Sequence, residues 1–372
     1  MGNAILNYES GYLIERRRDK LRYVDLSTGT QYMGNPTMFE SVSRYLMTND
    51  QFTDTLFEWS RPLKASVVIG ANQNVYSELN LDYIKQNHIQ ITRRAGGGGA
   101  VYVDFGNLTY AFVDTDDGTN YMNFKKYATP IINVLKKLGV NAALTGRNDL
   151  TVDGKKFSGM AAFKIGNRFY CGGTLMIDVN LDAADKALNP PKSKLASKGV
   201  KSVHSRVTNI RPYFSAKYQD ISIDDITEMI LKEIFKTDTI KEIPTHVMSK
   251  IDWQKVNDIT GHDYQDETWT MGKRYHDDNF HSNHYEGVGN VEISFSVNDG
   301  IVSHAKIFGD FNKANGNLKE IENKIAGVPF EKDNLEEAFS HTHLADNIGK
   351  LTPAQMADLM VNPVYQQKQQ EG

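Results

Sequence analysis

The chain has 372 residues, with 42 lysines and arginines against 46 aspartates and glutamates, so its formal net charge at pH 7 is −4. That balance disfavours non-specific binding to nucleic acid, which needs an excess of positive charge. The single cysteine excludes a disulfide framework. No apolar run approaches the roughly 18 residues that a membrane-spanning helix needs. We therefore expect a cytoplasmic protein that binds neither nucleic acid nor membrane, with two domains because the chain is too long for one typical core.

Helix and strand patterns alternate through the first part of the chain and predict a mixed α/β fold. Asn35 and Pro36 are typical of a helix start, and Phe39, Val42 and Leu46 follow at helical spacing. Runs of β-branched and aromatic residues predict a series of strands. These strands are expected at residues 66–69, 89–92, 100–103, 108–113, 150–152, 156–158 and 169–177.

Two further helices are expected to cover the sheet that these strands form. The apolar residues between Ile131 and Leu138 predict a helix that ends near Gly139, and Pro130 must lie in its first turn or kink it. Another helix is predicted to begin at Ser222, where Asp225 imitates a capping box.

Four consecutive glycines, Gly96 to Gly99, follow the arginine pair Arg93 and Arg94. Glycines inside a strand pattern mark a close backbone approach or a positive φ angle. Their uncrowded N–H groups can line an anion, and the two arginines add positive charge beside them. A bound ligand is one interpretation, and an irregular tight turn between two strands is the other.

Residues 146–162 combine an asparagine–aspartate pair with a lysine on a predicted strand. Asp153 and Gly154 are typical of a hairpin turn. Lys156 follows on a half-buried strand, where an ammonium group needs a partner or a chemical role, because burial would otherwise favour loss of its proton. Residues 195–209 add cations and hydroxyl groups without clear periodicity, as functional loops often do.

The sequence pattern of strands and helices begins again after a polar stretch near residues 244–252. Residues 291–307 alternate apolar and polar side chains around an Asn-Asp-Gly turn, which predicts a hairpin. A helix is expected between Leu318 and Gly327. We therefore divide the chain into a first domain at residues 1–247, a second at 253–364 and a polar, frayed tail at 365–372.

Together, the runs at 93–104, 146–162 and 195–209 resemble the lipoate–protein ligase A family of the biotin/lipoate ligase superfamily. The signature of that family is an arginine pair before a triple-glycine turn, a Gly-Arg-Asn-Asp box and a Gly-x-Lys-x-Ser-Gly lysine. Further matches follow in the order of the family, and the resemblance covers roughly residues 25–345. These matches are at residues 67–74, 107–112, 173–178, 188–190 and 205–209. The resemblance implies the long form of the family, with a mixed sheet flanked by helices and a smaller α/β accessory domain.

The resemblance also implies an ATP-dependent ligase that acts in two steps. Lipoic acid and ATP would give lipoyl-AMP and pyrophosphate, and the lipoyl group would then pass to a lysine of a carrier domain. Such carriers are the E2 subunits of 2-oxoacid dehydrogenases and the H protein of glycine cleavage. A lysine, backbone N–H groups and Mg²⁺ can offset the charge of the reacting phosphate, so the residue types suit this chemistry.

Matching the family motifs residue by residue implies that Lys156 is the catalytic residue, in contact with the carboxyl-derived oxygen and the adenylate phosphate. Asp149 would also hold the Mg²⁺ ion. The remaining matches imply residues that bind the acyl-adenylate and ATP. They are Arg93, Arg94, Gly97, Gly98, Gly99, Ala100, Asn148, Asp149, Gly173, Thr174, Lys198 and Gly199.

The sequence departs from the family pattern at four positions. Gly96, Val103, Ala71 and Gly172 stand where the family usually has serine, histidine, arginine and histidine. Ala71 and Val103 lie in segments expected to line the acyl pocket, so the pocket would be more apolar. The sequence therefore leaves open whether lipoate, octanoate or another short acid is preferred. It also leaves open the carrier and the oligomeric state.

Two alternatives to the ligase remain. An altered relative could bind an acyl-adenylate or a lipoylated carrier without completing the reaction. A lipoyl or octanoyl acyltransferase would need a nucleophilic cysteine, but Cys171 lies on the expected return strand of a hairpin, where burial as a small apolar residue is the better interpretation. The Gly-Arg-Gly-Arg-x-Gly-Arg run of biotin ligases is missing.

Residues 275–284 gather three histidines and two aspartates. Histidine and carboxylate are suitable zinc ligands, but no accompanying cysteine pair supports a structural site. A solvated loop between His276 and His284 is the preferred interpretation, and a metal site is the alternative.

Overall fold

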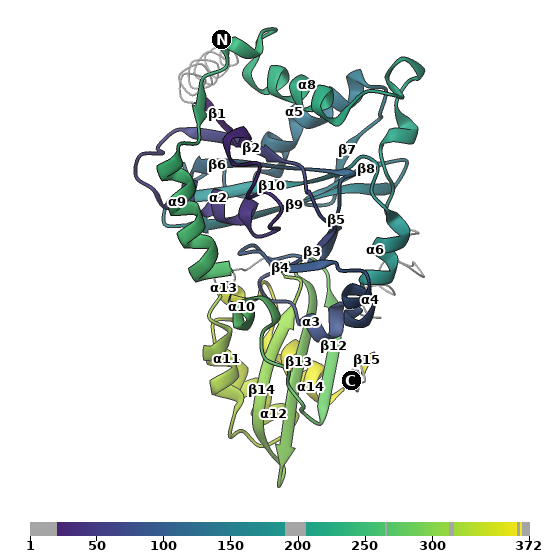
Figure 1. Ribbon diagram of the computed structural model, residues 1–372. Helices are drawn as coiled ribbons and strands as arrows, with labels where there is room; N and C mark the ends of the chain where they lie inside the picture. The colour runs from purple at the N-terminus through teal and green to yellow at the C-terminus, as the bar shows by residue number, and fades with distance from the viewer. Residues whose placement is uncertain (1–20, 190–205, 265, 312–315, 363–364, 367–372) are drawn as a thin grey trace, which may run out of the picture.

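The computed structural model describes residues 21–189, 206–264, 266–311, 316–362 and 365–366 (Figure 1). Its largest element is an eight-stranded mixed sheet with the strand order β11-β1-β2-β6-β10-β9-β8-β7. The strands are β1 (Leu21–Asp25), β2 (Thr55–Ser60), β6 (Asn107–Thr115), β7 (Ala143–Thr145), β8 (Asp149–Val152), β9 (Lys155–Ile165), β10 (Arg168–Met176) and β11 (Thr245–Val247). The predicted mixed α/β class is confirmed.

Helices cover both faces of this sheet (Figure 1). On one face, α5 (Phe124–Lys137) and α8 (Ile223–Phe235) pack on the side that carries Tyr110 and Phe112 of β6. On the other face, α2 (Met38–Thr48) and α9 (Lys250–Ile259) pack on the side that carries Ala111 and Val113. Consecutive residues of a strand point to opposite faces, so β6 contributes to two separate cores.

Single residues explain where α8 starts and where α5 lacks a backbone donor. Ser222 caps α8 by accepting a hydrogen bond from the Asp225 N–H, as predicted. Pro130 lies inside α5, which begins at Phe124, so the first of the two predicted alternatives, a place in the first turn, is excluded. A proline in the middle of a helix removes one backbone donor.

A second, three-stranded sheet with the order β4-β3-β5 packs beside the large one. In it β3 (Ser66–Ile69) runs parallel to β4 (Gln90–Arg93) and antiparallel to β5 (Val101–Val103). The short helices α3 (Val75–Glu78), α4 (Leu81–Gln86) and α6 (Leu181–Ala187) accompany it. Each of them starts at an asparagine whose side chain accepts a backbone N–H, which replaces one missing helical hydrogen bond.

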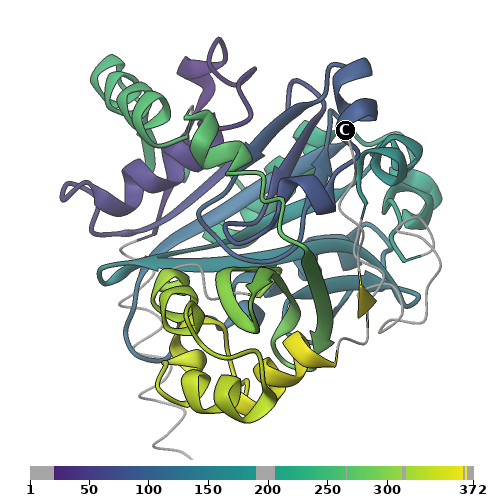
Figure 2. The ribbon, with the colours of Figure 1, turned by 90° about the horizontal axis from the view of Figure 1, so that it is seen from below.

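The C-terminal part has its own four-stranded sheet, ordered β14-β13-β12-β15, and its own apolar core. Seen from below in Figure 2, its helices gather beside the strands. Its elements are β12 (Asn279–Tyr285), β13 (Gly289–Asn298), β14 (Ile301–Gly309), β15 (Tyr365–Gln366), α11 (Leu318–Ile325), α12 (Lys332–Ser340), α13 (Leu344–Asn347) and α14 (Pro353–Val361). The predicted hairpin is present, with Asp299 and Gly300 at φ angles of 51° and 76° in its turn.

The segment between the two sheets belongs structurally to the first one. β11 pairs with β1 at the edge of the large sheet. Helix α9 starts at residue 250, and Trp253 and Val256 pack in the same core as α2. The division at residues 247 and 253 stays a prediction, and α9 crosses it. The first two residues of the predicted tail form β15, and residues 367–372 lie outside the described part.

Short helical turns complete the chain, and the π-helical turn η5 and helix α10 lead from α9 toward the C-terminal sheet. These elements are η1 (Ser27–Gly29), η2 (Arg211–Tyr213), η3 (Ala216–Tyr218), η4 (Ile240–Glu242), η5 (Thr260–Tyr264) and α10 (Glu267–Met271). Within the described ranges, the structure contains no helix with the length and apolar character needed to cross a membrane.

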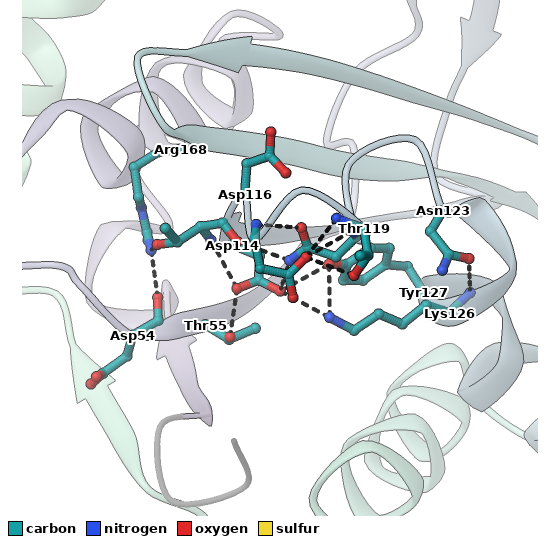
Figure 3. Close-up of polar contacts among 12 residues, drawn as sticks. Asp54, Thr55, Asp114, Asp116, Thr119, Asn123, Lys126, Tyr127 and Arg168 are labelled. Carbon is teal, nitrogen blue, oxygen red and sulfur yellow. Dashed lines mark hydrogen bonds and ion pairs between the residues drawn. The ribbon is translucent and has the colours of Figure 1, made fainter. Parts of the chain in front are cut away.

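A polar cluster around Asp114 fixes α5 to the large sheet (Figure 3). The Asp114 carboxylate accepts hydrogen bonds from Thr55 Oγ1 at 2.8 Å, Tyr127 Oη at 2.8 Å and Lys126 Nζ at 3.1 Å. Burial opposes ionisation of Asp114, but Lys126 and the hydroxyl donors outweigh it and lower its pKa. The cluster therefore stabilises the start of α5 with a buried, fully paired charge.

Candidate active site

A cavity of about 150 Å³ lies where the glycine run, the large sheet and the start of α2 meet. It contains many of the residues that the sequence singled out. The lining includes Glu40, Arg94, Gly97, Gly98, Gly99, Val103, Asn148, Lys156, Gly159, Met160, Ala161, Tyr170, Gly172, Gly173 and Thr174. Residues that are far apart in the sequence thus form one wall.

The glycine run forms a tight turn, and that turn is also a wall of the cavity. Gly98 has a φ angle of 93°, which favours glycine. A Cβ atom on Gly70 would lie only 2.0 Å from the Gly98 oxygen, so the turn packs directly on the end of β3. The Arg94 guanidinium donates to the oxygens of Gly97 at 2.8 Å and Gly99 at 2.9 Å. Arg94 therefore holds the turn in shape from inside the protein.

Arg93 points elsewhere, although it precedes Arg94 directly. Among the described residues, its guanidinium donates only to backbone oxygens, which lie in the turn after β3 and at the end of α10. These acceptors are Gly70, Ala71, Gln73, Trp269 and Thr270. The structure does not bring Arg93, Ala71 or Ala100 to the described lining of the cavity. Val103 does line it, as predicted.

Lys156 is the cation that the sequence predicted on a half-buried strand. Its Nζ lies 2.6 Å from Asp149 Oδ1, and Arg206 Nη2 lies 3.2 Å from the other oxygen of that carboxylate. A Cβ atom on Gly159 would lie 2.6 Å from Lys156 Nζ, so this glycine makes room for the ammonium group. The neighbouring Lys155 is exposed. The site thus presents one carboxylate between two cations.

The box at residues 146–149 is fixed to β9 through Asn148. The Asn148 side chain donates to the Met160 oxygen, and the Asn148 oxygen accepts the Met160 N–H at 2.8 Å. Asp149 does not itself line the cavity in the described part, but it binds Lys156, which does. Lys198 and Gly199, also predicted to bind the adenylate, lie outside the described residues.

Comparison with known proteins agrees with this arrangement. The family model of the lipoyl protein ligase A/B catalytic domain matches residues 38–235, and that of the bacterial lipoate protein ligase C-terminus matches residues 278–360. Lipoate-protein ligase LplJ of Bacillus subtilis is 37% identical over 79% of this chain and 88% of its own length. The chain belongs to the lipoate–protein ligase family. Lipoate–protein ligase 1 of Staphylococcus aureus is 36% identical over 88% of this chain and 97% of its own.

Solved structures of the family share the fold of this ligase. LipL1 of P. falciparum in complex with lipoate has a TM-score of 0.66 and 25% identity, covering 87% of this chain and 94% of its own. A bipartite lipoate protein ligase of Thermoplasma acidophilum, studied with its E2 lipoyl domain, has a TM-score of 0.58 and 26% identity. It covers 69% of this chain and 98% of its own. The family and fold expected from the sequence are confirmed, as is the expectation of an enzyme.

Several lining residues of this ligase were missed from the sequence, notably Glu40 and Tyr170. Glu40 is 8% exposed, and burial raises its pKa to about 7 although Arg94 opposes the shift. Behind it, burial raises the pKa of Glu58 to about 8, with Ser43 opposing the shift. The signal for Tyr170 was the period of two along β10, because Gly172 and Thr174 share its face.

Cys171 lies on the opposite face of β10 from the cavity and is fully buried. Burial raises its thiol pKa well above the ordinary value, so no thiolate is available as a nucleophile. We expect Cys171→Ala to leave acid-dependent pyrophosphate release within about twofold of the wild type, since it touches only the apolar core. Loss of acyl transfer in this variant, with the fold intact by circular dichroism, would instead indicate a cysteine acyltransferase.

The histidine-rich segment is a correction to the sequence analysis. Residues 279–285 form strand β12 rather than a solvated loop, and His281 is 5% exposed with its Nδ1 3.1 Å from the Leu359 oxygen. Phe280, His281 and Ser282 are all buried, because β12 is covered on both sides, and this long-range packing could not be seen from the local composition. Within the described ranges, no group of three or more histidine, cysteine, aspartate or glutamate side chains could hold a metal ion.

Proposed function

We propose that this ligase converts lipoic acid and ATP into lipoyl-AMP and then transfers the lipoyl group to a lysine of a carrier domain. The observation that carries the proposal is Lys156, a cation on the cavity wall that faces Asp149 at 2.6 Å. An acid and a nucleotide bring two anions together, so they need a positive group between them.

In the first step, a carboxylate oxygen of the acid attacks the α-phosphorus of ATP, and pyrophosphate leaves. Lys156 Nζ would contact both reacting groups once the phosphate competes with Asp149 for it. The backbone of Gly97 to Gly99 approaches the ligand without side chains, since these glycines line the cavity. A lipoate-protein ligase A that shares this fold, with a TM-score of 0.54, has been solved bound with ATP.

The proposal includes a Mg²⁺ ion, which the Asp149 carboxylate would hold. Mg²⁺ is commonly held by one or two carboxylates together with substrate phosphates, and the Asp149 side chain is 24% exposed beside Lys156. Its carboxylate is the protein ligand that we propose for the ion, which would compete there with Lys156 and Arg206. When bound there, Mg²⁺ would offset phosphate charge.

In the second step, the ε-amine of the carrier lysine attacks the acyl carbon and loses a proton. AMP leaves, and the acyl carbon and the lysine nitrogen are joined by an amide bond. An E2 lipoyl domain is the partner named with the Thermoplasma ligase, which supports a carrier of this kind. The H protein is the other expected carrier.

A cytoplasmic location also stays a prediction.

The test is pyrophosphate release from ATP with lipoate, with octanoate and without acid, followed by mass analysis of an added lipoyl domain. We expect lipoate to stimulate release and the carrier to gain one lipoyl group. If no acid stimulates release by the folded protein, the proposal fails and the chain is an altered relative that binds without catalysis.

A further inference from the structure

The loop between β5 and β6 presents an exposed aromatic side chain on a fixed backbone. Phe105 is 55% exposed. The Asp104 carboxylate accepts the Gly106 N–H at 2.8 Å, and the Gly106 oxygen accepts two further N–H groups, those of Ile177 and Asp178, each at 3.0 Å. A Cβ atom on Gly106 would lie only 2.1 Å from the Asp178 oxygen, so the loop packs directly on the segment after β10. The backbone is therefore held on both sides while the aromatic ring faces water.

This loop borders the opening of the cavity. Val103 and Thr109, on the two strands that the loop joins, both line the cavity. The Cα atoms of Val103 and Phe105 are two residues and so at most about 7.6 Å apart. Arg61 Nε donates to the Phe105 oxygen at 2.9 Å, and Leu63, two residues after Arg61, lines the cavity while it is 38% exposed. A residue that is both exposed and part of the lining lies where a cavity opens. Phe105 and Leu63 thus form an exposed apolar rim, which we call the rim patch.

Phe105 also lines a second, open hollow of about 520 Å³ between its loop and the start of α8. The Arg211 guanidinium in this hollow is already engaged. It donates to the oxygens of Gln219 at 2.7 Å and Ile221 at 3.0 Å, and it pairs with Asp178. The hollow therefore offers a concave surface rather than an anion site, and it extends the rim patch away from the cavity.

The second step of the proposed reaction needs a protein at this opening. The acceptor amine lies at the end of a lysine side chain, so the backbone of the carrier must rest against the rim while the amine reaches the acyl carbon. Aromatic side chains are enriched at protein interfaces, and a loop that is already fixed loses little conformational freedom on binding. Arg61 and Lys64 add two cations beside the patch, and neither forms an ion pair with the residues that the structure describes.

We infer that the rim patch and the hollow beside it are the docking surface for the carrier domain, with Phe105 as the anchor. The inference rests on the proposed function, because it takes the carrier as the second substrate. The surface fits a carrier that has an apolar side chain and a carboxylate close to its acceptor lysine. Phe105 does not line the cavity in the described part, so it acts on the carrier step and not on activation of the acid.

The test is Phe105→Ser, measured with two acceptors of different size. The kcat/KM for an added lipoyl domain should fall about tenfold, mainly through KM, because an interface anchor is lost. Hydroxylamine is the small acceptor. Its nitrogen attacks the acyl carbon and loses a proton, AMP leaves, and a hydroxamate forms. The rate with hydroxylamine should equal that of the wild type, since this acceptor needs no docking surface.

Two further variants serve as controls. Phe105→Leu keeps an apolar contact and should recover most of the kcat/KM for the lipoyl domain. Ile301→Ser also removes an exposed apolar side chain, which is 43% exposed, but at the start of β14. The other end of that strand contacts the catalytic part, where the Gly309 N–H donates to the Asn72 oxygen at 2.9 Å. Ile301 thus lies away from the cavity, and its replacement should leave both rates unchanged.

An unchanged KM for the lipoyl domain in folded Phe105→Ser would overturn the inference. An equal loss with hydroxylamine would do the same, because it would place the effect in the cavity. A wild-type dimer that Phe105→Ser dissociates without a change in KM would assign the patch to a second copy of this chain instead.

Failure of the proposed function can be told apart from failure of this inference. If the wild type releases no pyrophosphate with any acid, the proposed function fails by itself. Calorimetric titration of the lipoyl domain into wild type and Phe105→Ser then measures docking directly. Weaker binding by the variant would support the docking surface, and equal binding would refute it.

Discussion

Lys156→Ala should reduce lipoate-dependent pyrophosphate release about a hundred- to thousandfold while the protein remains folded. The reason is electrostatic, because Lys156 Nζ is a cation on the cavity wall and its removal leaves Asp149 to repel an incoming phosphate. The backbone of Lys156 pairs with Arg206 and Thr208, and those hydrogen bonds do not depend on the side chain. Initial rates of pyrophosphate release and the melting temperature of each variant are the measurements.

The chain offers a matched control for this variant in Lys155→Ala. Lys155 is the preceding residue on the same strand, but it is exposed, so its replacement should change the rate by less than about twofold. A folded Lys156→Ala variant that releases pyrophosphate at the rate of Lys155→Ala would defeat the mechanism. Lys156→Arg is a useful third variant, because it keeps the charge but not the compact ammonium shape.

The cavity wall that carries the glycine run and Lys156 could be located from the sequence because its signals are local. The glycine run could be recognised from backbone requirements alone, and the Asp153-Gly154 turn placed Lys156 on a strand. The structure has that turn, with φ angles of 48° and 75° at the two residues. Both steps use neighbours in the chain, and no long-range contact is needed to make them.

The sequence could not show which way a side chain points where long-range packing decides it. Arg93 and Arg94 were interpreted as an equivalent pair, yet only Arg94 lines the cavity, because successive residues of an extended segment face opposite ways. The acceptors of Arg93 include Trp269 at the end of α10, which lies 176 positions further along the chain. Glu40 was missed for a related reason, since a helical glutamate usually faces solvent and this one is covered by the sheet.

A buried acid behind the cavity should make the stability of the protein depend on pH. Glu58 is fully buried between α2 and the sheet, where Ser43 donates to one carboxyl oxygen and the other has no partner in the described part. Burial raises its pKa from 4.5 to about 8. The folded state therefore binds this proton more tightly than the unfolded chain. The resulting stability is fully present below pH 4.5 and is lost as the pH rises toward about 8.

Glu58→Gln should remove this dependence, because the amide stays neutral and can still accept the hydrogen bond from Ser43. Between pH 5 and pH 8 the wild type should lose on the order of 4 kcal/mol that the variant keeps. Denaturant unfolding at several pH values measures the difference, and at pH 8 the variant should be the more stable protein.

Glu233→Gln is the control of opposite sign. Burial opposes ionisation of Glu233, but Lys137, Lys236 and Asn133 lower its pKa to about 2, so its replacement should destabilise the protein at neutral pH. Equal pH slopes in wild type and Glu58→Gln would show that this carboxyl is ionised in the folded state.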